Sequence, residues 1–160
     1  MSASFPQILD AFTAAVAAGD GQRFAACFTE DGEYDDVFYG IFRGRAAIAD
    51  MLENHFHRDG RDFDWEMLDP VSDGRHAYAR WRFSYTSRMA ENEGTRVLME
   101  GVGCYILRDG LIERYEDMAR TGELMVRLGL PAEKMHRTLS RMARRQEALP
   151  GAERHLRRDG

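Results

Sequence analysis

The sequence predicts one α+β domain, in which helices come first, a mostly antiparallel sheet follows and a helical extension ends the chain. Three observations support this prediction. Apolar residues recur at helical spacing over much of residues 6–57, side chains alternate between polar and apolar over residues 62–118, and the helical period returns after residue 120. The 160 residues are the length of one domain.

The first helix is predicted over residues 6–18, because four apolar side chains share one helical face: Ile8, Leu9, Phe12 and Val16. Gly19 ends this helix, and Asp20 can cap a short second helix that carries Phe24. Gly32 then opens a strand that ends in a turn at Gly40. A third helix is expected from about Arg45 to His57.

Four strands are predicted next. The first is half-buried, since Phe63, Trp65 and Met67 alternate with acidic residues. Two long strands cover residues 75–87 and 96–108, and the Asp109-Gly110 hairpin signal leads into a strand over residues 111–118. The strand at 96–108 is apolar on both faces, which indicates cover on both sides. Helices supply one cover, and a second subunit is a candidate for the other.

The chain divides into a domain over residues 1–130, a helix over residues 131–150 and a flexible tail over residues 151–160. Pro131 opens the helix, and three apolar side chains form its stripe: Met135, Leu139 and Met142. This stripe must be buried against the domain or against a partner subunit.

Composition excludes several classes of function. Hydrophobic residues make up 44% and charged residues 31% of the chain, and no run approaches the roughly 18 apolar residues of a membrane span. The first residues lack a basic segment typical of a signal peptide, so a cytoplasmic protein is expected. Residues 131–160 carry a net charge of +4 against −9 for residues 1–130. This basic segment has no interleaved aromatic residues, so we expect no nucleic-acid binding.

Tyr34 and Asp36 are candidate catalytic residues because positions i and i+2 of a strand share one face. In an apolar pocket, desolvation would raise the pKa of Asp36 and make it a general base; alternatively, its carboxylate caps the turn at Gly40. Tyr34 either donates to Asp36 or a substrate oxygen, or simply lines the pocket. His55 is either a proton shuttle or a core histidine. The histidines show no ligand spacing, so no metal is predicted.

Three segments resemble the nuclear transport factor 2-like superfamily, in particular its SnoaL-like and ketosteroid-isomerase-like branches. They are AAVAAGDGQRFAACFTEDGEYDDVFYG (14–40), GRAAI (44–48) and GVGCYILRDGLIERYEDM (101–118). The resemblance implies a cone, in which N-terminal helices lie across a strongly curved sheet and enclose a pocket open at one end. It also implies that Asp36 stands where ketosteroid isomerases keep their proton-shuttling aspartate.

The same resemblance marks departures from each known activity. Phe12 and Gly103 fall where ketosteroid isomerases have the two oxyanion donors, and Arg120 falls where SnoaL-like cyclases have a catalytic aspartate. Limonene-epoxide hydrolases have a tyrosine and an asparagine at positions similar to Tyr34 and Asp36. The predicted ligand-binding residues are Phe12, Trp81, Phe83, Tyr85, Met99, Gly103 and Arg120.

These observations predict a pocket for a small apolar or oxygenated molecule, with a homodimer formed through the outer sheet face. As an enzyme, the protein would act by acid–base catalysis without a cofactor, as an isomerase, a cyclase or dehydratase, or a hydrolase. The alternative is a non-catalytic module for ligand binding or dimerisation.

Overall fold

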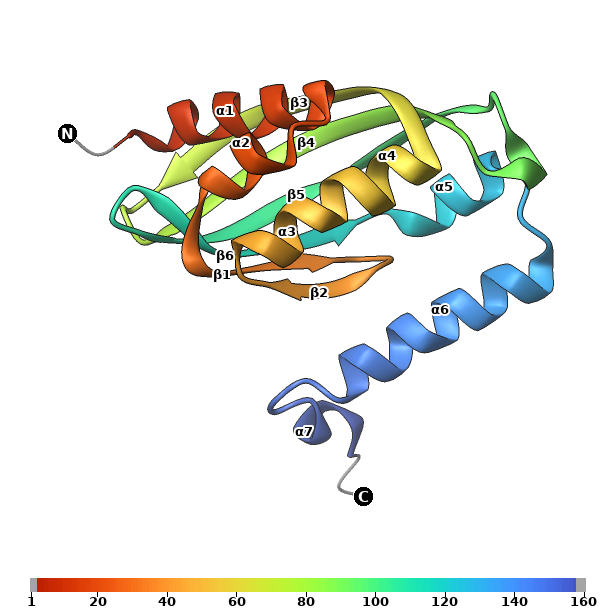
Figure 1. Cartoon of the computed structure of the whole chain (residues 1–160). Helices are drawn as coiled ribbons and strands as arrows, with labels where there is room; N and C mark the ends of the chain where they lie inside the picture. Colours follow the sequence, from red (N-terminus) through yellow and green to blue (C-terminus); the bar gives the residue numbers. More distant parts are fainter. Residues whose placement is uncertain (1–2, 158–160) are drawn as a thin grey trace.

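Six strands form one curved sheet in the computed structural model, which describes residues 3–157 (Figure 1). Their order is β2-β1-β6-β5-β4-β3, with β1 and β6 parallel and every other pair antiparallel. The strands are β1 (Phe28–Asp36), β2 (Gly40–Arg43), β3 (Gly60–Ser72), β4 (His76–Ser87), β5 (Arg96–Arg108) and β6 (Leu111–Ala119). The predicted α+β fold and its mostly antiparallel sheet are therefore confirmed.

β1 begins earlier than the sequence indicated. Phe28 already pairs with Ile112 of β6, and a bulge separates that pair from the next, Glu33 with Arg114. Gly32 lies inside this bulge, where there is no room for a side chain. A Cβ atom added to Gly32 would lie only 2.9 Å from the Cβ of Phe28. The glycine predicted to open the strand thus permits a kink within it.

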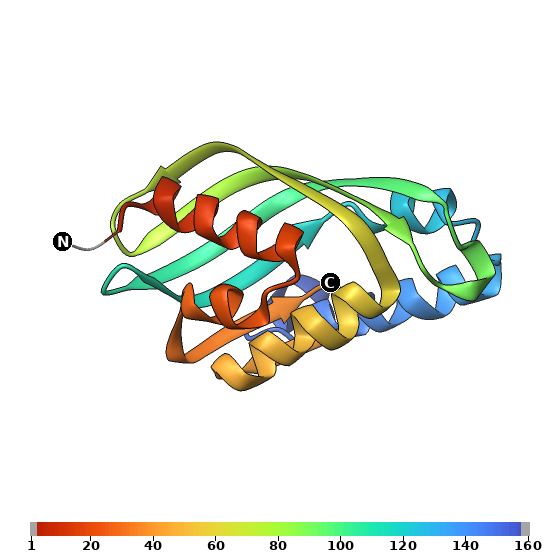
Figure 2. The ribbon, with the colours of Figure 1, turned by 45° about the horizontal axis from the view of Figure 1, so that its top comes forward.

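The N-terminal helices lie on one face of the sheet (Figures 1 and 2). They are α1 (Phe5–Ala18), α2 (Gly21–Ala26), α3 (Arg45–Met51), the π-helix η1 (Leu52–Phe56) and α4 (His57–Asp59). Gly19 ends α1 with a left-handed φ of 69°, and the Asp20 side chain accepts the amide N–H of Arg23, as expected for an N-cap. The last three segments together form the helix predicted over residues 45–57.

Aromatic side chains fill the space between these helices and the sheet. Phe12 has no exposed surface, and five aromatic rings have centroids within 4.7–6.5 Å of its ring: Phe24, Phe28, Trp65, Tyr105 and Tyr115. The core is therefore built around a residue that the family resemblance had placed in the ligand site.

The remaining helices are η2 (Ala90–Asn92), α5 (Thr121–Arg127), α6 (Ala132–Glu147) and α7 (Glu153–Leu156). α6 passes the β1–β2 hairpin, where Arg145 forms an ion pair with Asp35 and Arg141 donates to the Phe38 carbonyl (Figure 1). α7 lies within the predicted tail, of which residues 158–160 fall outside the described part of the chain. No helix in the described part is long and apolar enough to cross a membrane.

Candidate functional site

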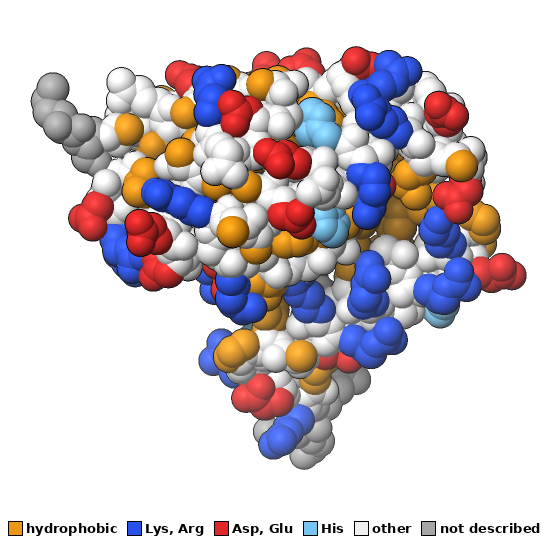
Figure 3. Space-filling view, in the orientation of Figure 1, with side chains coloured by type: hydrophobic (Ala, Val, Ile, Leu, Met, Phe, Trp, Pro, Cys, Tyr) orange, Lys and Arg blue, Asp and Glu red, His pale blue; other side chains and the backbone are white. Residues whose placement is uncertain are grey.

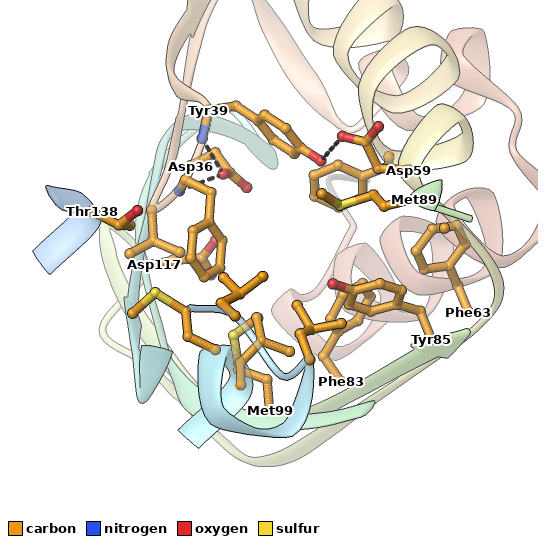
Figure 4. Close-up of a pocket in the computed structure, with 18 of the residues that line it drawn as sticks. Asp36, Tyr39, Asp59, Phe63, Phe83, Tyr85, Met89, Met99, Asp117 and Thr138 are labelled. Carbon is orange, nitrogen blue, oxygen red and sulfur yellow. Dashed lines mark hydrogen bonds between the residues drawn. The ribbon is translucent and has the colours of Figure 1, made fainter. Parts of the chain in front are cut away.

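A cavity of about 230 Å³ opens between the sheet, the end of β1 and helices α5 and α6 (Figure 4). Aromatic side chains dominate one side of it: Phe56, Phe63, Trp65, Trp81, Phe83 and Tyr85. Met99, Leu124 and Met125 continue the apolar lining. A cavity of this size and character suits a small, largely apolar molecule.

Asp36 brings a carboxylate to this apolar cavity. It is the last residue of β1 and only 4% exposed, and its Oδ1 accepts the amide N–H groups of Phe38 and Tyr39, each at 2.8 Å (Figure 4). Burial raises the pKa of Asp36 from 3.8 to about 6, although these two hydrogen bonds act in the opposite direction. The carboxylate thus caps the turn through Oδ1, which leaves Oδ2 for a ligand.

Asp117 is a second carboxyl group on the cavity wall (Figure 4). It lies on β6, and its Oδ1 accepts a hydrogen bond from the hydroxyl of Tyr115, a fully buried residue two positions earlier. Burial raises the pKa of Asp117 well above its ordinary value, and the negative charge of Asp36 raises it further. Burial and the neighbouring charge thus both favour the protonated form of Asp117.

The parallel pairing of β1 with β6 brings the two aspartates together. Tyr34 is paired with Tyr115 and Asp35 with Glu116, so Asp36 and Asp117 follow side by side on the same face. Two neighbouring carboxyl groups in a low-dielectric site do not both ionise easily, which separates their pKa values. Two carboxyl groups whose pKa values differ in this way can act chemically as a base and an acid.

A further polar chain lies across the cavity from Asp117. The hydroxyl of Tyr39 donates to Oδ2 of Asp59 at 2.6 Å, and Arg58 forms an ion pair with the same carboxylate at 2.6 Å (Figure 4). The Arg58 hydrogen bond lowers the pKa of Asp59, which keeps this carboxylate ionised. Asp59 is therefore already paired, unlike Asp36.

Tyr34 is fully buried and does not line the cavity. Its ring centroid is 4.8 Å from that of Tyr115, and its hydroxyl is buried without a hydrogen-bond partner among residues 3–157. Burial raises the pKa of Tyr34 far above its ordinary value, and the nearby charges of Asp117 and Asp36 add to this. Its hydroxyl stays protonated and lies near the two aspartates.

The other candidates from the sequence fall into two groups. Trp81, Phe83, Tyr85 and Met99 all line the cavity together with Asp36. The structure places the remaining four elsewhere: Phe12, Gly103, His55 and Arg120. Phe12 is in the core, and the space beside Gly103 is occupied by the rings of Tyr105 and Tyr115.

His55 and Arg120 are partly or largely exposed. His55 lies against the rings of Tyr39 and Phe42, with Nε2 3.9 Å from a carboxylate oxygen of Asp50. Arg120 forms an ion pair with Glu123 at 2.6 Å and lies 3.9 Å from Glu100.

Sequence reasoning missed Asp117 as a cavity residue, although a signal was present. The pattern Tyr-acid-Asp occurs twice, as Tyr34-Asp35-Asp36 and as Tyr115-Glu116-Asp117. Each copy places a tyrosine and an aspartate on one strand face, and the structure aligns the two copies in parallel. It also missed the residues that α6 contributes to the cavity: Lys134, Thr138 and Arg141.

Comparison with known proteins agrees with this architecture. Residues 9–115 match the model of the SnoaL-like domain, which covers most of the chain. The chain belongs to the SnoaL-like family. No curated protein shows significant sequence similarity to this SnoaL-like chain.

Solved structures share the SnoaL-like fold at low sequence identity. A Catenulispora acidiphila protein with a ketosteroid isomerase-like fold, solved in complex with trimethylamine, has a TM-score of 0.71 at 19% identity over 81% of this chain and 98% of its own. TsrD from Streptomyces laurentii has a TM-score of 0.67 at 20% identity, covering 79% and 95%. An LEH-like epoxide hydrolase of M. tuberculosis has a TM-score of 0.63 at 18% identity, covering 86% and 93%.

Within residues 3–157, no three His, Cys, Asp or Glu side chains are placed to hold a metal ion. The two cysteines are free thiols, Cys27 buried and Cys104 half-buried.

Proposed function

We propose that this SnoaL-like protein binds a small, largely apolar molecule and acts on it by cofactor-free acid–base catalysis. Asp36 is the general base and Asp117 the general acid. The observation that carries the proposal is the pair of neighbouring aspartates on the wall of an otherwise apolar cavity. Pairs of titratable groups whose surroundings push their pKa values apart mark acid and base roles.

Each aspartate has one oxygen fixed by the protein. Because Asp36 Oδ1 is held by two backbone N–H groups, Oδ2 takes the proton from a carbon or from a water molecule. Tyr115 holds Oδ1 of Asp117, so the carboxyl proton on Oδ2 is free to be donated to a developing oxygen anion. This division of roles fits an isomerase, a cyclase or dehydratase, and a hydrolase.

A carboxylate base in an apolar cavity can be tested without knowledge of the natural substrate. We expect the protein to accelerate the elimination of 5-nitrobenzisoxazole, in which a base removes the ring C–H proton, the C–H electrons form a nitrile and the N–O bond breaks to release a coloured phenolate. The rate should rise with pH through a midpoint near 6, because Asp36 must lose its proton to act. A pH-independent rate, or one no faster than with free acetate, would count against Asp36 as base.

A second function is favoured by a separate observation, a group of exposed apolar side chains on the outer face of the sheet, which also carries the ion pairs of Arg82 with Glu66 and Glu100. Three large side chains there are 46–65% exposed, namely Tyr78, Leu98 and Met118, and they lie on β4, β5 and β6. Their strands pair so that these residues and the half-buried Val102 share one face. We infer that this face is the homodimer interface, and a dimerisation module without catalysis remains the alternative function.

Light scattering at micromolar concentration should give the mass of two chains. Changing Leu98 and Val102 to Glu should give the mass of one chain, because each carboxylate would then be desolvated in the interface. Val126→Glu is the matched control, since Val126 is 66% exposed on α5 and away from the sheet face. A single-chain mass for the unmodified protein would exclude the proposed interface.

A further inference from the structure

We propose that the ligand of this cavity carries one anionic group, such as a carboxylate or sulfonate, on its apolar body, and that Arg141 binds that group at the entrance. This inference rests on the cavity of the proposed function and adds the chemical class of its ligand. It comes from α6, the helix outside the part of the chain matched by the family model.

One face of α6 supplies the polar edge of the cavity. Lys134, Thr138 and Arg141 all line it, and their spacing of four and three residues places them on the same side of the helix. In the space-filling view, a hollow lined by hydrophobic side chains lies between the body of the domain and α6, with Lys and Arg side chains along its rim (Figure 3). The entrance is therefore cationic although the chain as a whole carries −5.

Arg141 is a cation at this entrance whose guanidinium N–H groups are largely unused among the described residues. Lys134 is 3.5 Å from a carboxylate oxygen of Glu91, and Arg145 further along α6 is paired with Asp35. Arg141 has no carboxylate partner among the described residues and makes one long hydrogen bond of 3.5 Å, to the Phe38 carbonyl. Its guanidinium can therefore bind a carboxylate or sulfonate through two parallel hydrogen bonds.

The position of Arg141 determines how such a ligand is oriented. Arg141 donates to the carbonyl of Phe38, two residues after Asp36, and Thr138 lies on the same side of the cavity as Asp36 and Asp117 (Figure 4). Phe63, Phe83 and Tyr85 line the other side (Figure 4). With its anionic group bound to Arg141 at the entrance, the ligand places its apolar body along these rings, and the part next to the anionic group lies beside the two aspartates.

Two fluorescent probes that share a ring system separate the charge from the apolar body. 8-Anilinonaphthalene-1-sulfonate carries an anionic group, and N-phenyl-1-naphthylamine lacks it. Titration of the full-length protein should show both probes binding. Arg141→Gln should weaken the affinity for the sulfonate about tenfold, as expected for loss of a charge-assisted hydrogen bond, and leave the amine unchanged.

Arg137→Gln is the matched control, because Arg137 lies one turn earlier on α6, is exposed and does not line the cavity. It removes the same charge and should change neither affinity. If Arg141→Gln binds the sulfonate as tightly as the unmodified protein does, the anion site is overturned while the cavity stands. The same conclusion follows if Arg137→Gln weakens sulfonate binding as much as Arg141→Gln does. If neither probe binds the unmodified protein, the cavity itself is refuted, and the proposed function with it.

Discussion

Replacing Asp36 by Asn is expected to slow the elimination of 5-nitrobenzisoxazole at pH 7 by about two to four orders of magnitude, the usual contribution of a positioned general base. The amide is nearly the same size and shape but cannot take up a proton at this pH. Its oxygen can still accept the amide N–H groups of Phe38 and Tyr39, so the turn after β1 is preserved. The rate constants of the two proteins, measured at saturating probe, test this directly.

Loss of structure would not explain such a result, because Asp36→Asn should be more stable than the unmodified protein at pH 7. The pKa of Asp36 is about 6 in the folded state and near 3.8 in the unfolded chain, so between these values the folded state binds more protons. The free energy of unfolding contributed by this group therefore falls as the pH rises from about 4 to 6, and the loss persists at pH 7. Asn removes the penalty of burying a charge.

Thermal unfolding across this pH range checks the sign. The unmodified protein should lose stability relative to Asp36→Asn as the pH rises, and the two should converge in acid. Binding of N-phenyl-1-naphthylamine should be the same in both, since the change adds no bulk to the cavity. Undiminished elimination by the variant would remove Asp36 from the proposed mechanism.

Local sequence patterns determined most of what could be predicted about the fold. The alternation around Trp81 and Phe83 revealed both the strand and the face of it that lines the cavity. Asp36 could be predicted as a site residue for the same reason. Its place at the end of a strand, two residues after Tyr34 and before the turn at Gly40, follows from the sequence of a few neighbouring residues. The role of such a residue can be predicted from the sequence, because it depends only on the strand that carries the residue.

Residues whose role depends on distant pairing were not accessible in this way. Asp117 becomes the neighbour of Asp36 only because β6 pairs with β1 in parallel across about eighty residues of sequence. Arg141 reaches the cavity because α6 passes the β1–β2 hairpin, and its own apolar stripe does not specify that position. Gly103 and Phe12 do not line the cavity, because the rings of Tyr105 and Tyr115 fill the space beside both residues.

Phe12→Ala is expected to lower the free energy of unfolding by about 3–5 kcal/mol, the range for removing a buried phenylalanine ring. Five aromatic rings surround Phe12, and the cavity left behind could close only if all of them moved. A loss of this size is a large fraction of the total stability of an ordinary domain. Chemical denaturation measures it, and Phe42→Ala, at a half-buried position on β2, should show a clearly smaller loss.

Phe12→Tyr distinguishes a core position from a ligand-site position. A ring that faced a ligand would accept a hydroxyl and gain an oxyanion donor, whereas a ring enclosed by other rings would bury that hydroxyl without a partner. We therefore expect Phe12→Tyr to be destabilised and to gain no elimination rate. Full stability in this variant would place Phe12 at the cavity after all. If the loss is observed, the ring at position 12 does not face the ligand, and Asp117 is the donor to the developing oxygen anion in the proposed mechanism.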